Sequence, residues 1–311
     1  MGEADVAALV AETRKAAGVV AKDAPVDATQ SKAATLSPAD LITAERKSSG
    51  SEIYGRLLNP DTPLQERQAI FASLEAKAQE GDQKALYVVG SLYRIGNELP
   101  ASPVARDMDK ARLYLSNAAT HGEILAMAKM AEIEVASMHP MEAMTWAQIY
   151  GHYALLQPEA YRPSDGYLGE LVDRASRGIG KAQLQDVVDH LNAFITAYDS
   201  PVKSGAVQRS SIPADMAATD VPKKSITFHG SDYRPPAGFA DFLVSFAPDG
   251  TVKDVWLLDA TPDNKLGNLL RTSIKGYRVG AAPASESGGL RYGFIPSIFD
   301  DGKFQLAHKS P

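Results

Sequence analysis

The stretch EGDQKALYVVGSLYRIG, residues 80–96, decides the helical part of the fold. Its apolar positions recur at the i, i+3, i+4, i+7 spacing of a single helix face. They are Ala85, Val88, Val89 and Leu92. The segment opens on Gly-Asp and closes on Gly, the residue that most readily ends a helix in a left-handed conformation. We therefore predict one amphipathic helix bounded by glycines.

The same pattern returns 41 residues later in the chain. Gly81 is followed four residues on by Ala85, and Gly122 is followed four residues on by Ala126. Second-helix segments with small residues on one face lie at 110–122 and 142–154, and flanking helices are expected at 65–79 and 182–198. A helix pair that recurs at a fixed interval indicates a stack of helices, an architecture that usually binds other proteins.

Two further expectations concern the interior of this stack. Gly96 and Gly122 are predicted to end their helices in a left-handed conformation. The large aromatic residues on the repeating faces are predicted to be core residues: Tyr93, Tyr114, Trp146 and Tyr150.

The last third of the chain changes to a strand pattern. FADFLVSF at 239–246 alternates with period two, and Pro-Asp-Gly follows it as a tight turn before VKDVWLL at 252–258. The segment 264–277 returns to helical spacing, and 290–299 alternates again. The predicted order is β-β-α-β, an α+β unit.

Composition shifts divide the chain into four parts. They are an N-terminal helix with a polar linker at 1–37, a helical repeat domain at 38–199, a linker at 200–224 and an α+β domain at 225–311. The second linker is rich in Ser, Pro and Ala without periodicity, which favours a flexible or extended connection.

The overall composition excludes several classes of function. The 311 residues are 44% hydrophobic, enough for real cores, and the net charge of -6 offers no basic surface for nucleic acid. No apolar run approaches the roughly 18 to 20 residues that span a bilayer. The chain has no cysteine, so it has no disulfides, zinc thiolates or cysteine nucleophile, which suits an oxidising compartment or the cytosol.

The helical segments resemble the Sel1-like subfamily of tetratricopeptide-type repeats. The matching residues are Gly81, Asp82, Ala85, Leu92, Tyr93, Gly96, Lys110, Ala111, Tyr114, Leu115, Ala118, Ala119 and Gly122. One repeat fits well and a second, ending near residue 156, is degenerate. The resemblance implies a right-handed α-solenoid that acts as an adaptor surface for other proteins.

The C-terminal segment is similar to the TonB C-terminal domain over about 225–299. The matching residues are Val244, Phe246, Asp249, Gly250, Val252, Val255, Leu257, Leu269, Tyr277 and Pro283. That family offers a sheet edge to an extended partner segment in the bacterial periplasm. Its energy transducers also carry a membrane anchor and a Pro-rich spacer, which this sequence lacks. The resemblance implies a β-augmenting fold; a transducing component without its anchor is an alternative.

Motifs for catalysis are weak. Ser200-x-x-Lys203 matches an acyl-transfer pattern, but the adjacent Pro201 and the expected linker argue against it. The six histidines show no metal-ligand spacing. We expect no catalytic, cofactor-binding or metal residues. An enzyme acting on peptidoglycan, with Asp241 and Asp254 paired across the hairpin, is the rival hypothesis.

Aromatic residues are the candidate partner contacts. Tyr87 lies off the apolar stripe of its helix, and it is predicted to be exposed together with Tyr153. On the C-terminal unit the candidates are Tyr277, Tyr292 and Phe294. The expectation is a non-enzymatic adaptor that binds envelope proteins and no nucleic acid, with the periplasm as its compartment and the cytoplasm as the alternative. A homodimer through the C-terminal unit is a further possibility.

Overall fold

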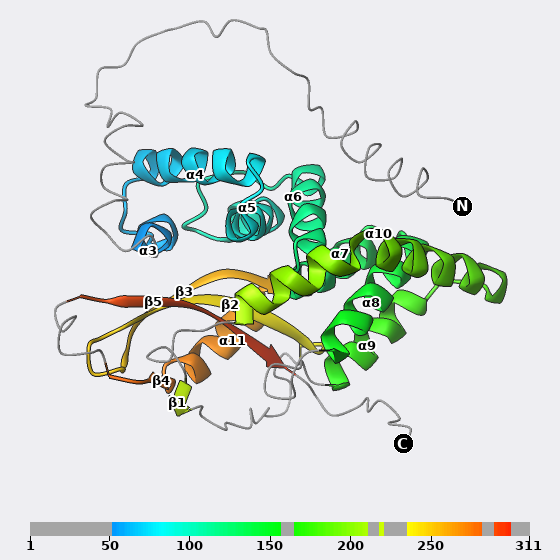
Figure 1. Cartoon of the computed structure of the whole chain (residues 1–311). Coiled ribbons are helices and arrows are strands. Elements are labelled where there is room, and N and C mark those ends of the chain that lie inside the picture. Colours follow the sequence, from blue (N-terminus) through cyan, green and yellow to red (C-terminus); the bar gives the residue numbers. More distant parts are fainter. Residues whose placement is uncertain (1–51, 157–164, 211–217, 221–234, 282–288, 300–311) are drawn as a thin grey trace, which may run out of the picture.

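The computed structural model describes residues 52–156, 165–210, 218–220, 235–281 and 289–299. Within these residues the chain forms nine α-helices and a small three-stranded antiparallel sheet near the C-terminus (Figure 1). The predicted helix and polar linker at 1–37 lie outside the described residues.

Eight of the helices precede the sheet. They are α3 (Glu52–Leu58), α4 (Leu64–Gln79), α5 (Gln83–Ile95), α6 (Met108–Thr120), α7 (Ile124–Ala136), α8 (Pro140–Leu155), α9 (Asp165–Ser176) and α10 (Leu184–Ser210). Helices α5 and α7 begin 41 positions apart and have 13 residues each, and successive helices from α3 to α9 pack against one another. The helices predicted at 65–79, 80–96, 110–122 and 142–154 are therefore confirmed.

Capping residues fix where these helices begin and end. The side chains of Asp82 and Asp107 accept hydrogen bonds from the backbone amides of Ala85 and Lys110, as N-caps of α5 and α6. Gly96 ends α5 with a φ of 50°, and Gly122 follows α6 with a φ of 91°. Both glycines have the predicted positive φ, but the ψ of -136° at Gly96 lies outside the left-handed helical region.

Helix α10 corrects the prediction of a linker beginning at residue 200. The helix runs without interruption through Pro201 to Ser210. Val202 and Ala206 are buried against the turn after α6, where a Cβ on Gly205 would overlap the carbonyl oxygen of His121. This glycine contact holds the last turns of α10 against the helical region, although the segment has few apolar residues.

The sheet contains the strands β2 (Gly238–Phe246), β3 (Val252–Thr261) and β5 (Arg291–Phe299) in the order β3-β2-β5. Helix α11 (Asn264–Ile274) connects β3 to the rest of the unit. A separate pair of short strands consists of β1 (Ala218–Asp220) and β4 (Arg278–Val279). The predicted β-β-α-β order of the main elements is confirmed.

Helices cover both faces of the sheet (Figure 1). On one face Leu257 and Ala260 pack so closely on α11 that a Cβ on Gly267 would overlap Leu257. On the other face lie α3, α5, α7 and α9, which contact the side chains that alternate with the first set. All nine residues of the central strand β2 are buried as a result.

The helices and the sheet are in contact within the described residues, and most of the predicted linker beyond residue 210 lies outside them. The sheet packs on the helices α3, α5, α7 and α9 through buried residues, so the two parts share one core. No helix among the described residues combines the length and apolar character that crossing a membrane requires.

Candidate functional site

The face between the helices and the sheet contains a buried charge cluster. Its members come from α5, α7, β2 and β3, and they are Tyr87, Ser91, Arg94, Lys129, Asp241 and Asp259. Asp241 and Asp259 lie directly opposite each other on the neighbouring strands β2 and β3. Each cluster residue is at most 8% exposed.

Lys129 is the centre of the buried charge cluster. Its Nζ lies 2.7 Å from Asp241 Oδ2, 3.1 Å from Asp259 Oδ2 and 2.7 Å from the hydroxyl of Ser91. It also lies 4.2 Å from the centre of the Tyr87 ring. All three ammonium hydrogens therefore have acceptors, and the cation contacts an aromatic face.

Arg94 completes the pairing on Asp259. Its Nε and Nη2 donate to the two carboxylate oxygens at 2.8 Å and 2.5 Å, and Nη2 also donates to the carbonyl of Ala260. Burial opposes ionisation of Asp259, but Arg94 and Lys129 hold the pKa of that carboxyl below its usual value. Two cations thus neutralise two carboxylates in a site that water does not reach.

The Ser91 and Lys129 pair has the spacing of a nucleophile and its base, but not the chemistry. A lysine whose protons are donated to two carboxylates has no lone pair with which to accept a proton from serine. Both side chains are also fully buried. The buried charge cluster therefore holds the helices to the sheet.

A second set of contacts ties α7 and α9 to the start of β2. Arg174 donates from both terminal nitrogens to Glu132 at 2.6 Å, and Tyr167 donates its hydroxyl to the same carboxylate at 3.0 Å. The Tyr167 ring meets Phe239 edge-on, and Glu170 accepts from the backbone amide of Ala237. Together these contacts fix the end of the sheet at which β2 begins.

The prediction that Tyr87 and Tyr153 are exposed is wrong. Tyr87 is 3% exposed and donates its hydroxyl to Asp241, because the sheet covers the side of α5 that the sequence left without a partner. Tyr153 is 1% exposed, since α10 packs on α8 and brings Phe194 against its ring. Burial raises the pKa of Tyr153 to about 12. The predicted core residues Tyr93, Tyr114 and Tyr150 are buried, and Trp146 is partly buried.

The candidates on the C-terminal unit are half-buried. Tyr292 stacks on Trp256 with ring centres 6.4 Å apart, and Phe294 meets Tyr54 edge-on at 5.4 Å. Tyr277 lies just after α11 and packs on the core, and burial raises its pKa. Tyr292 and Phe294 lie on the same strand, whereas Tyr277 belongs to a different part of the unit.

The carboxylate pair of the rival enzyme hypothesis does not form. Asp254 lies opposite Ser245, whose hydroxyl donates to it at 2.9 Å, while Asp241 lies opposite Asp259. Four positions along a strand separate the two carboxylates by about 13 Å. Pairs that cleave glycosidic bonds lie about 5 to 9.5 Å apart. Among the described residues, no group of three or more His, Asp or Glu side chains is arranged to hold a metal ion.

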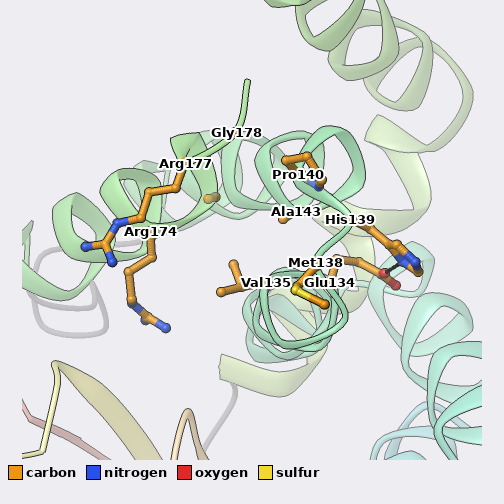
Figure 2. A pocket seen from close by; sticks show the side chains of 10 residues that line it. Glu134, Val135, Met138, His139, Pro140, Ala143, Arg174, Arg177 and Gly178 are labelled. Atoms are coloured by element: carbon orange, nitrogen blue, oxygen red, sulfur yellow. Dashed lines mark hydrogen bonds and ion pairs between the residues drawn. The ribbon is translucent and has the colours of Figure 1, made fainter. Parts of the chain in front are cut away.

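A pocket of about 380 Å³ lies where the α7–α8 turn meets the end of α9 (Figure 2). Val135, Pro140 and Ala143 supply apolar surface, and Met138 at the turn is 86% exposed with a φ of 60°. Arg174 also lines the pocket, but its guanidinium is already paired with Glu132. Most charged side chains at this pocket are already paired with other side chains of the protein.

The two outer edges of the sheet differ. At the start of β3, Thr251 forms a bridge to Arg278, and the amide of Val279 donates to Gly250, so β4 covers part of that edge. Strand β5 pairs with β2 over nine consecutive residues, and no described strand pairs with its other side. The open edge of β5, defined as its backbone groups that face away from β2, is the candidate binding surface.

Pro296 determines which amides belong to the open edge. Residues of an antiparallel strand alternate between groups that bond the neighbour and groups that face away. Proline has no amide hydrogen, so within this regular ladder Pro296 belongs to the outward set. The amides of Tyr292, Phe294 and Ile298 therefore also point away from β2.

Sequence reasoning missed the buried charge cluster, and it did not say which strand would carry the sheet edge that the resemblance implies. The only signal for the cluster is a charge within otherwise apolar segments, as at Lys129 in ILAMAKMAEIEVA and Asp241 in FADFLVSF. The signal for the open edge is Pro296 within a strand pattern, since proline is confined to edge strands and bulges. Comparisons with models of known protein families, with curated proteins and with solved structures each return no match to this chain.

Proposed function

We propose that this chain is a non-enzymatic adaptor of the cell envelope that pairs an extended segment of a partner protein with the open edge of β5. The observation that carries this proposal is a sheet whose β3 edge is partly covered by β4 at its start, and whose β5 edge has no further strand among the described residues. Such an edge presents a row of unpaired amides and carbonyls, which is a template for a further strand.

The resemblances support the same function. TonB-like domains bind by strand addition, and Sel1-like repeats are adaptor surfaces, so both halves point to protein binding in the periplasm. In this chain the sheet covers the face of the helical region formed by α3, α5, α7 and α9. The role we assign to the helices is therefore to hold the sheet rigidly and to leave their outer surface for further contacts.

Hydrogen exchange at single residues tests whether the edge is open. We expect the amides of Tyr292 and Phe294 to exchange rapidly in the full chain, and those of Gly293 and Ile295 to be protected by β2. Equal protection at all four positions would mean that the edge is already covered, and the proposal would be rejected.

A pair of variants tests strand addition itself. Phe294→Ala removes the ring and keeps the outward amide, whereas Phe294→Pro removes both. A partner recovered from envelope extract with the wild-type chain should bind Phe294→Ala and lose most of its affinity for Phe294→Pro. It should also protect the amides of Tyr292 and Phe294. Equal binding to the two variants, with both folded by circular dichroism, would contradict strand addition.

A further inference from the structure

We infer that Pro296 limits the open edge of β5 to a short extended peptide and prevents β5 from pairing with a second copy of the chain. This inference rests on the proposed function and adds the class of partner. It starts from the ladder between β5 and β2, which is regular over all nine residues.

The outward groups of β5 are interrupted at Pro296. Tyr292 and Phe294 each offer an amide and a carbonyl, but Pro296 offers only a carbonyl. An added strand can therefore form complete hydrogen-bonded pairs over about 291–295 and loses a donor beyond that point. A partner segment of roughly five residues uses this length fully.

Pairing with a second copy of β5 would lose more hydrogen-bond donors than pairing with another strand. In a two-fold antiparallel pair each copy contributes its own Pro296, so a ladder along the full strand lacks two donors. A strand of another sequence along the full edge lacks only the one donor of Pro296, because it brings no proline of its own. Proline on an edge strand is a known protection against pairing between identical edges. The preferred occupant is therefore a short segment of another protein.

Restoring the amide tests this inference. Pro296→Val and Pro296→Ala each return a donor to the open edge, and Ser297→Val is the matched control because the amide of Ser297 faces β2. Sedimentation of the full chain over a range of concentrations should give a monomer for the wild type and for Ser297→Val. Both Pro296 variants should dimerise about four- to a hundredfold more tightly, since a two-fold pair regains two hydrogen bonds worth roughly a factor of two to ten each.

Each result separates this inference from the proposed function. Monomeric Pro296 variants that retain the wild-type circular dichroism spectrum would overturn the inference, as would a wild type that dimerises as tightly as they do. Dimerisation of Ser297→Val would also overturn it, because strand propensity and not the amide would be responsible. The proposed function fails instead if a partner binds Phe294→Pro and Phe294→Ala equally, a result that leaves the sedimentation outcome unchanged.

Discussion

At the scale of single residues, the most informative feature is a lysine with no contact with water. Lys129 is fully buried, and its three hydrogens are donated to Asp241, Asp259 and Ser91. A buried pair with both partners present is a weak contributor to stability, but loss of one partner leaves an uncompensated charge in the core. The stability of the fold should therefore be sensitive to this residue.

We predict that Lys129→Met lowers the free energy of unfolding by about 3 to 5 kcal/mol. Methionine fills a similar volume, so the loss measures the uncompensated charge, chiefly at Asp241, and not a cavity. Urea unfolding followed by circular dichroism gives the value. Lys203→Met is the control, since Lys203 pairs only with Asp199 on the exposed side of α10, and its loss should cost less than about 0.5 kcal/mol.

A second substitution separates charge from packing. If unpaired carboxylates cause the loss, adding Asp241→Asn to Lys129→Met should recover part of it, because an amide leaves no net charge in the core. A double variant as unstable as the sum of the single variants would show that the two residues act independently.

The sequence shows these charged residues, but it does not show that they come together in one cluster. Lys129, Asp241 and Asp259 are charged positions inside apolar segments, which indicates burial only when the facing element is known. Tyr87 shows the same limit, because it lies off the stripe of its own helix and contacts a strand 154 residues away. Periodicity describes the face toward sequence neighbours, and it carries no information about a distant element that covers the opposite face.

At the scale of elements, the local sequence pattern predicts helices and strands correctly where tertiary packing favours the same structure. Helix α5 lies between the predicted Gly-Asp opening and Gly96, α6 ends just before the predicted Gly122, and β2, β3 and β5 coincide with the alternating segments. The end of α10 differs, because its helix beyond Tyr198 is stabilised by a close contact and not by an apolar stripe. Gly122 and Gly205 are 83 positions apart, and neither carries a signal that it faces the other.

We predict that Gly205→Ala destabilises the protein by about 1 to 3 kcal/mol, although alanine favours helices. The added methyl would overlap the carbonyl of His121, so α10 would have to move away from the turn after α6. Thermal unfolding measures the effect. The neighbouring exposed Ser204→Ala adds no contact, and its melting temperature should equal or slightly exceed that of the wild type. A Gly205→Ala protein as stable as Ser204→Ala would contradict the contact.

At the scale of the whole molecule, the pairing in the buried charge cluster links stability to pH. The pKa of Asp259 is lower in the folded protein than in the unfolded chain, because Arg94 and Lys129 stabilise its charged form against the effect of burial. The contribution of this group is therefore complete above the unfolded value near about 4, and it is lost as the pH falls through the folded value.

We predict that the free energy of unfolding decreases as the pH is lowered from about 5 to about 3, with a smaller slope in Asp259→Asn. The variant is less stable at neutral pH, since it leaves Arg94 without its carboxylate, so the slope and not the absolute value is compared. Urea titrations at several pH values supply the slopes. Identical slopes in the two proteins would show that Asp259 has no part in the acid transition.

The shared core further implies that the helices and the sheet unfold together. The face of β2 that carries Asp241 is buried because α3, α5, α7 and α9 cover it, and α5 in turn buries Tyr87 and Arg94 against the sheet. Separating the two parts would expose both charged and apolar surfaces, so neither part is expected to remain folded when the other opens.

The two tryptophans allow this to be measured, because Trp146 lies in α8 and Trp256 in β3. In Trp146→Phe the remaining fluorescence reports the sheet, and in Trp256→Phe it reports the helices. We predict that in each variant the fluorescence and the circular dichroism at 222 nm give the same urea midpoint, as a single cooperative transition requires. A sheet signal that changes at lower urea than the helical signal would indicate two independent domains. Such a result would contradict the proposal that the helices hold the sheet, and with it the open edge of β5, in a rigid position.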